Sequence, residues 1–320
     1  FQKQIPFKLT ASQKKCIEEI YNDIKKASPM KRLLQGDVGS GKTIVAAAAV
    51  TATIKNNKQA ALMAPTEVLA EQHLISFKKY LEYFDVDIHL LTSSVKDRED
   101  IYEIIDRGDP VLIIGTHALI QDKVNFNNLG LAIIDEQQRF GVEQRKKLVD
   151  NDDFTPHQLV MTATPIPRTT ALAIYGDLEL SVIDELPPGR KKIKSRVLSG
   201  GKRDNKEVYE TAYEHLKNES QIFVVCPYIE ESENSDIKAA ENVFKLYRSE
   251  FKDYKVDLLH GKMKPEEKEL KMLQMQNGEI DILVSTVVIE VGIDITNATL
   301  MIIESAERFG LNQLHQLRGR

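Results

Sequence analysis

The sequence lacks the features of several specialised classes of protein. It has only two cysteines, Cys16 and Cys226, which are too few and too isolated for a disulfide framework or a zinc site. No apolar stretch approaches the roughly 20 residues that are needed to cross a bilayer, and residues 1–10 lack the apolar core of a signal peptide. We therefore expect a protein of a reducing compartment, the cytoplasm, without membrane contact.

An excess of positive charge is missing as well. The chain has 43 Lys and Arg residues against 48 Asp and Glu residues, which gives a formal net charge of -5. No overall cationic field attracts the phosphates of a nucleic acid, so an argument for nucleic-acid binding has to come from local motifs. With 320 residues, of which 42% are hydrophobic and 28% charged, the chain has the make-up of a globular protein with two packed cores.

Short apolar runs alternate with amphipathic stretches along most of the chain. The first group of runs comprises "KRLLQ", "AALMAP", "PVLIIGT", "LAIIDE" and "HQLVMTAT". Such alternation predicts an α/β fold with a mainly parallel sheet flanked by helices. The Pro-Pro-Gly breaker and basic run of "DELPPGRKKIK" indicate a linker, beyond which the alternation resumes. We therefore predict two domains, residues 1–186 and residues 187–320.

A phosphate-binding loop is the most specific motif in the chain. The segment "GDVGSGKT" matches G-x-x-x-x-G-K-[ST] and stands between an expected strand and an expected helix, which disfavours an ordinary glycine-rich turn. Glycines let the backbone amides wrap around phosphates, and the helix N-terminus adds positive potential. Lys42 would reach the β- and γ-phosphates, and the Thr43 hydroxyl would bind Mg²⁺. The nucleotide-binding residues predicted here are Gly36, Asp37, Val38, Gly39, Ser40, Gly41, Lys42 and Thr43.

An acidic pair completes the expected catalytic site. In "LAIIDEQQRFG", four apolar residues form a strand that ends at Asp135 and Glu136, and ligands bind at that edge of a parallel sheet. Asp135 would hold Mg²⁺, while Glu136 would polarise the attacking water. Alone, such a pair could be a solvated loop start, but the phosphate loop upstream favours catalysis. ATP is favoured over GTP, because the nearest match to the Asn-Lys-x-Asp motif that reads guanine fails at Ala60.

Taken together, the motifs resemble the superfamily 2 helicases and, within them, the motor of the RecG family of branched-DNA helicases. The resemblance covers essentially the whole chain and rests on "RLLQGDVGSGKT", "DEQQRFGVEQR", "MTATPIPRT", "YGDLELSVIDELPPGRK" and "STVVIEVGIDITNATLMIIESAERFGLNQLHQLRGR". The Mfd family shares the phosphate loop and "TATPIPRT" but is less similar to "SVIDELPPGR". The resemblance implies two RecA-like P-loop lobes with ATP between them, the second lobe truncated at its C-terminus.

The resemblance also assigns roles to residues outside the phosphate loop. It makes Gln13 the adenine contact with Phe7 as a stacking partner, and it places Gln316 and the catalytic Arg320 at the nucleotide from the second lobe. The implied contacts to DNA phosphates are Thr66, Thr116 and Thr286, and the implied coupling residues are Gln138, Thr162 and Thr164. Gln138 departs from the family, which usually has histidine there and whose histidine helps to link the lobes. Val287 replaces a commoner threonine.

These features favour an ATP-dependent DNA helicase or translocase motor that remodels stalled forks and Holliday junctions in repair and recombination. Two alternatives stay open: an Mfd-like duplex translocase in transcription-coupled repair, and a nucleotide-binding module without net hydrolysis. We expect a monomer that binds forked or branched DNA mainly through its phosphates and uses ATP and Mg²⁺. The family's branch-engaging N-terminal domain and C-terminal coupling element have no room in this chain, so we expect weak unwinding.

Overall fold

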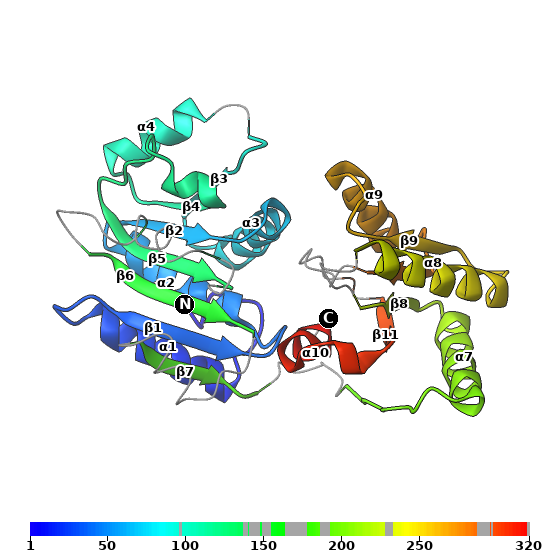
Figure 1. Ribbon diagram of the computed structural model, residues 1–320. Helices are drawn as coiled ribbons and strands as arrows, with labels where there is room; N and C mark the ends of the chain where they lie inside the picture. Colours follow the sequence, from blue (N-terminus) through cyan, green and yellow to red (C-terminus); the bar gives the residue numbers. More distant parts are fainter. Residues whose placement is uncertain are drawn as a thin grey trace. The chain divides into compact units, whose positions relative to one another are not determined.

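The computed structural model of the chain describes residues 1–95, 98–136, 140, 148, 155–163, 178–185, 193–227, 233–286, 295 and 297–318. It divides into two compact units, Phe1–Arg190 and Lys191–Arg320, drawn from blue to green and from green to red in Figure 1. The domain division expected after residue 186 stays a prediction, because residues 186–192 lie outside the described part.

The first unit is built on a seven-stranded sheet in which every pairing is parallel. The strand order is β3-β4-β2-β5-β6-β1-β7. The strands are β1 (Lys31–Gly36), β2 (Gln59–Met63), β3 (Asp87–Leu91), β4 (Val111–Gly115), β5 (Leu129–Asp135), β6 (His157–Thr162) and β7 (Glu179–Ile183). Because the strands run in one direction, their C-terminal ends meet at one edge of the sheet, where ligands bind in such folds.

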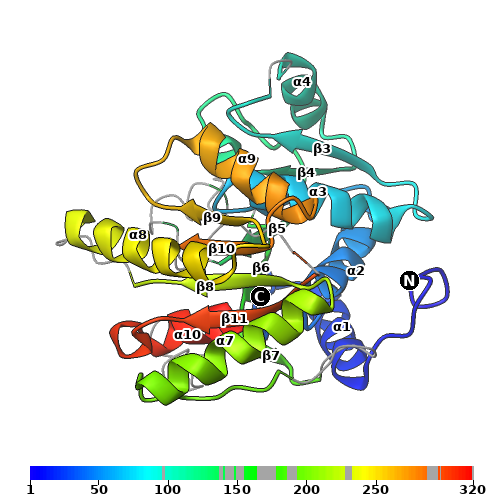
Figure 2. The same cartoon turned by 90° about the vertical axis from the view of Figure 1, so that its right-hand side faces the viewer.

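Helices cover both faces of this sheet. One core cluster packs α1 (Ala11–Ile24), α2 (Lys42–Lys55) and α3 (Glu67–Leu81) against one face, where they lie side by side (Figure 2). The other face packs against α4 (Glu99–Arg107) and the 3₁₀ helix η1 (His117–Ile120). Residues 44–50 of α2 are at most 2% exposed, because small alanines let this helix press against the sheet and its neighbours. The phosphate loop thus leads into a rigid helix.

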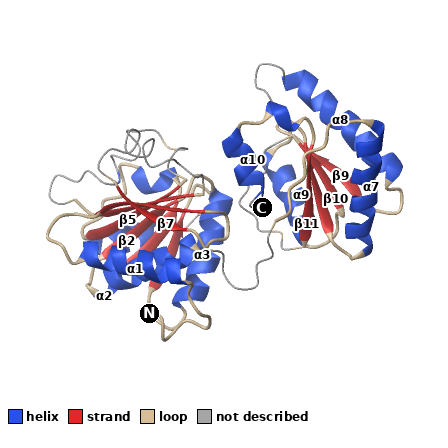
Figure 3. Cartoon of the chain, turned by 90° about the horizontal axis from the view of Figure 1, so that it is seen from below, coloured by secondary structure: helices blue, strands red, loops and turns tan. Residues whose placement is uncertain are grey.

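The second unit repeats the α/β plan on a four-stranded parallel sheet in the order β11-β8-β10-β9. Its strands are β8 (Gln221–Val225), β9 (Val256–Leu259), β10 (Ile282–Ser285) and β11 (Ala298–Ile303). Figure 3 shows these strands in red among blue helices, which are α7 (Lys202–Lys217), α8 (Glu233–Glu250), α9 (Pro265–Gln276) and α10 (Leu311–Arg318). The α/β class with parallel sheets in both halves, expected from the alternation of apolar runs, is confirmed. Among the described residues, no helix has the length and apolarity that crossing a membrane requires.

A buried arginine ties three elements of the first unit together. Arg32 on β1 is 4% exposed, and its guanidinium donates to Asp23 on α1 at 2.8 Å and to Ser181 on β7 at 2.8 Å. It also pairs with Glu19 at 3.4 Å and with Glu179. A buried charge is tolerated only when it is paired and hydrogen-bonded, so this cluster fixes α1 and β7 against the strand that leads into the phosphate loop.

Replacement of Arg32 by methionine should destabilise the first unit strongly. Asp23 is itself 5% exposed and would keep its ion pair with Lys26 at 2.7 Å, but the buried cluster would lose the cation that Asp23, Glu19 and Glu179 share. Loss of one partner of a buried ion pair costs ~3 kcal/mol or more. The control is Arg107→Met, whose partner Asp109 lies 2.8 Å away in a pair with both side chains more than half exposed. That change should leave the free energy of unfolding nearly unchanged, because solvent screens an exposed ion pair. Urea unfolding followed by circular dichroism measures both; equal losses would contradict the structural role of Arg32.

Candidate functional site

The phosphate loop joins the end of β1 to the start of α2. Gly39 and Gly41 have φ angles of 71° and 92°, in the left-handed region that glycine adopts without strain. A Cβ atom at Gly41 would lie 2.3 Å from Nε2 of Gln13, so a side chain there would displace the Gln13 amide. Gly41 is also the N-cap of α2 and offers no side chain to cap the first-turn amides. Those amides and the helix dipole form a site suited to an anion.

The side chain of Lys42 folds back over the loop. Its Nζ donates to the carbonyl oxygens of Gly36 at 2.7 Å and Asp37 at 3.1 Å, so the ammonium group lies over the strand end of the loop. Thr43 follows in the first turn of α2 and is half-buried. The structure therefore brings a cation, a hydroxyl and the helix N-terminus to one place, as the motif predicts.

Gln13 fastens the phosphate loop to α1. Its Nε2 donates to the Ser40 carbonyl at 2.8 Å, and its Oε1 accepts from the Thr10 amide at 3.0 Å, within a capping box at the start of the helix. Gln13 is 3% exposed, whereas Phe7 is 41% exposed and its ring lies edge-on to Tyr80. The contact that the structure shows for Gln13 is thus with the backbone of the loop. The adenine contacts of Gln13 and Phe7 stay predictions.

The acidic pair stands at the end of β5, and a histidine holds its first member. Oδ2 of Asp135 lies 2.8 Å from Nε2 of His73 on α3, and both residues are 8% exposed. Burial raises the pKa of the Asp135 carboxyl, but the hydrogen bond from His73 and the positive charge of Lys42 outweigh burial and hold the pKa below its usual value. An ionised carboxylate at this position suits a divalent cation.

His73 belongs to none of the motifs that predict the site. The available signal was its position on the buried face of α3, which it shares with Ala70, Phe77 and Leu81. A histidine within an apolar stripe needs a polar partner when it is buried. Sequence spacing could not identify that partner, because Asp135 lies 62 residues further along the chain.

Glu136 connects the acidic pair to the end of β6. Its φ of 49° is uncommon for a residue other than glycine, and such strain is concentrated at functional sites. The Glu136 amide donates to the Met161 carbonyl at 3.0 Å, and its Oε1 accepts from the Ala163 amide at 3.1 Å. The carboxylate therefore contacts the segment that follows Thr162, a predicted coupling residue. The other two coupling residues, Gln138 and Thr164, lie outside the described part of the chain.

The predicted DNA contacts differ in their exposure. Thr66 is half-buried and caps α3, its Oγ1 accepting from the Leu69 amide at 3.3 Å. Thr116, which follows β4, is 2% exposed, and Thr286, which follows β10, is 1% exposed. Neither of these two hydroxyls has a hydrogen-bond partner among the described residues. The DNA role of all three stays a prediction, and Thr66 is the most accessible of them.

The remaining nucleotide contacts expected from the second half of the chain are not tested by the structure. Arg320 lies outside the described residues. Gln316 belongs to α10, but its side chain lies outside the described part. Their roles stay predictions.

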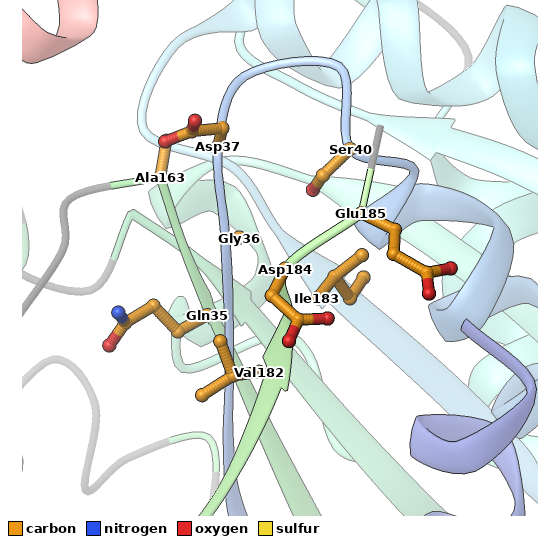
Figure 4. Close-up of a pocket in the computed structure, with 9 residues that line it drawn as sticks. All are labelled: Gln35, Gly36, Asp37, Ser40, Ala163, Val182, Ile183, Asp184 and Glu185. Carbon is orange, nitrogen blue, oxygen red and sulfur yellow. The ribbon is translucent and has the colours of Figure 1, made fainter. Parts of the chain in front are cut away.

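A pocket of about 170 Å³ flanks the phosphate loop on the β7 side (Figure 4). Gly36, Asp37 and Ser40 line it from the loop, and Asp184 and Glu185 line it from the end of β7. The Glu185 carboxylate also accepts from the amides of Ala11 at 2.9 Å and Ser12 at 3.3 Å, and so caps α1. These carboxylates repel phosphate, so the pocket borders the anion site without forming it.

Comparisons with known proteins agree with this geometry. The DEAD/DEAH box helicase family matches residues 10–172, and the helicase conserved C-terminal domain matches residues 205–320. The chain is 51% identical to the ATP-dependent DNA helicase RecG of Aquifex aeolicus, with 99% of this chain and 40% of that protein covered. It is 48% identical to RecG of Bacillus subtilis, with 100% of this chain and 47% of that protein covered. It therefore spans less than half the length of these relatives.

Solved structures show the same relationship. RecG bound to a three-way DNA junction superposes with a TM-score of 0.84 at 44% identity, over 99% of this chain and 41% of that chain. Dbp5 of S. cerevisiae bound to RNA and ADP BeF3 has a TM-score of 0.65 at 16% identity, over 98% of this chain and 84% of that chain. The latter likeness concerns the fold alone.

The fold and the site together define a P-loop nucleotide-binding motor region with two RecA-like α/β lobes. The chain belongs to the DEAD/DEAH box helicase family. The expected resemblance to the RecG-type motor of superfamily 2 is thereby confirmed.

Replacement of Gly41 by alanine should abolish tight nucleotide binding. The new Cβ would clash with Gln13 and would occupy a backbone conformation that alanine rarely adopts, so the loop must open. We expect the affinity for a fluorescent ATP analogue to fall by at least about tenfold, or ~1.4 kcal/mol. Gly200→Ala is the matched control, since its φ is +84° and its Cβ would meet nothing within 4 Å. If both variants bind like the parent chain, the proposed cradle is wrong.

Proposed function

We propose that this chain is the ATP-hydrolysing motor of a RecG-type DNA helicase that remodels forks and Holliday junctions in repair and recombination. The observation that carries the proposal is the 51% identity to a RecG helicase along 99% of the chain. The phosphate loop and the acidic pair, brought to one sheet edge, supply the chemistry that such a motor needs. One relative was solved on a three-way DNA junction, which supports branched DNA as the substrate.

The residues present fit a magnesium nucleotide. Thr43 offers a hydroxyl at the first turn of α2, and Asp135 offers a carboxylate that its surroundings keep ionised. Mg²⁺ would neutralise charge on the β- and γ-phosphates when bound. The Lys42 ammonium group would donate to phosphate oxygens in place of the loop carbonyls that it contacts here. Glu136, held from the β6 side by the Ala163 amide, would orient the attacking water.

The second unit would supply the remaining parts of the cycle. Arg320 is the proposed arginine finger, a group that accelerates phosphoryl transfer by roughly 10³ to 10⁵ in P-loop GTPases. Gln316 would contact the nucleotide beside it, and Gln13 and Phe7 would bind the adenine. We assign coupling between nucleotide and DNA to Gln138, Thr162 and Thr164.

DNA would contact the motor through its phosphates. Thr66, Thr116 and Thr286 are the proposed contacts, and such contacts position a protein without reading sequence. The net charge of -5 is compatible with this role, because a translocase must release each phosphate that it binds. We place the protein in the cytoplasm and expect it to act as a monomer.

Replacement of Glu136 by glutamine should separate binding from hydrolysis. The amide keeps the size of the side chain but cannot act as a base, so ATP turnover should fall on the order of 10² or more. Affinity for the ATP analogue should stay within about twofold. Glu82→Gln, at an exposed position just after α3, should leave both quantities unchanged. Unchanged turnover in the Glu136 variant would favour a nucleotide-binding module without net hydrolysis.

Whether this chain can act as the motor of a RecG on branched DNA can be tested in a chimaera. We expect this chain to replace the matching region of Bacillus subtilis RecG, to which it is 48% identical, and to support ATP turnover that a three-way junction stimulates more than a linear duplex of equal length. A chimaera that carries Lys42→Ala provides the background rate. Equal stimulation by both DNAs, with the parental RecG preferring the junction, would favour the Mfd-like alternative.

A further inference from the structure

Helix α3 connects a proposed DNA contact with a proposed metal ligand. Thr66 caps its N-terminus, and His73 stands on its buried face seven residues later. Through His73 the helix holds Oδ2 of Asp135 at 2.8 Å. The mechanism given above uses Thr66 and Asp135 but leaves His73 and its helix without a role.

The direction of the His73–Asp135 hydrogen bond follows from charge. Oδ2 of Asp135 lies 2.8 Å from Nε2 of His73, and the carboxylate form that a metal ligand takes can only accept a hydrogen bond. Nε2 of His73 therefore carries the proton and donates it to Oδ2. A donor that occupies one carboxylate oxygen fixes the rotation of the group, and such partners of metal ligands tune metal affinity.

The N-terminal end of α3 is suited to receive a phosphate. The Thr66 oxygen accepts from the Leu69 amide, and the same hydroxyl keeps its proton for donation to a second group. Thr66 is half-buried, so a ligand can reach it. Glu67 fastens the same helix end to the neighbouring loop, its Oε1 accepting from the Ser93 amide at 2.8 Å.

The helix between the two ends is continuous and packed into one core cluster. Ala70, Phe77 and Leu81 are 0%, 0% and 3% exposed, and they pack into the same core cluster as α2. Thr66 and His73 are separated by about two turns, or roughly 10 Å along the axis. A shift of the N-terminus would therefore reach His73 and, through its 2.8 Å contact, the Asp135 carboxylate.

We propose that α3 couples DNA binding to the magnesium site, with His73 as the positioning residue that orients Asp135 according to the contact at Thr66. The inference rests on the proposed function, since it assumes that Asp135 binds Mg²⁺ and that Thr66 contacts DNA. Coupling of this kind is reciprocal: DNA changes the affinity for the magnesium nucleotide by the same factor as the nucleotide changes the affinity for DNA.

The test measures that factor directly. The affinity of the chain for a fluorescent duplex is determined by anisotropy with Mg²⁺ and a non-hydrolysable ATP analogue, and again without nucleotide. The coupling ratio is the ratio of these two affinities for DNA. We expect a coupling ratio of at least about 5 for the parent chain and below about 2 for His73→Leu. His73→Gln should keep a near-parental ratio, because its amide can donate from the position of Nε2. The matched control is His89→Leu, which removes a histidine 2.8 Å from Asp87 on β3 and should leave the ratio unchanged.

A second readout follows the metal itself. Electron paramagnetic resonance measures the affinity of the ADP complex for Mn²⁺ without DNA. We expect at least about tenfold weaker Mn²⁺ binding in His73→Leu than in the parent chain, and recovery of the parental affinity in His73→Gln.

If His73→Leu does not fold, His73→Asn replaces it, because its amide is too short to reach Asp135. A parental coupling ratio and parental Mn²⁺ affinity in the Leu or Asn variant would overturn the inference. A parent chain whose affinity for DNA is the same with and without the nucleotide would also overturn the inference. Both readouts measure binding, so a failure to hydrolyse ATP would count against the proposed function alone.

Discussion

Parallel pairing of the central strands is the constraint on which the rest of the site depends. β6 pairs with β1 on one side and β5 on the other, and the register sets Gln35 opposite Thr162 and Asp135 opposite Met161. The phosphate loop, the acidic pair and the segment after β6 therefore leave the sheet at one edge. A slip of one residue would exchange the two faces of a strand, and apolar contacts on both faces prevent it.

Buried charged side chains have two different roles in the first unit. Around Arg32 they fasten α1 and β7 to the strand that carries the phosphate loop. Around Asp135 they keep a buried carboxylate ionised, because His73 and Lys42 favour its ionised form against the cost of burial. Glu136 adds a strained backbone that Met161 and Ala163 hold in place. The site is thus organised by the same contacts that stabilise the fold.

The parts of the site that short motifs encode could be predicted from the sequence, and the parts that depend on tertiary contacts could not. The phosphate loop and the Asp135–Glu136 pair are local patterns, and alternating apolar runs predict the parallel sheets. The partner of Asp135 comes from a helix 62 residues away, and a second cap of α1, beyond its local capping box, comes from Glu185, 174 residues from Ala11. The burial of Thr116 could not be predicted either, because "GTHAL" is typical of an exposed loop, whereas Thr116 is 2% exposed.

The central claim is that His73 and Lys42 prepare Asp135 for the metal of a magnesium nucleotide bound to the phosphate loop. A crystal structure of the chain with Mg²⁺, ADP and beryllium fluoride tests it most directly. The account predicts the metal beside Thr43 and Asp135, bound directly or through water, with the His73–Asp135 hydrogen bond retained. A nucleotide whose metal has no contact with Asp135, or an Asp135 turned away from His73, would contradict it.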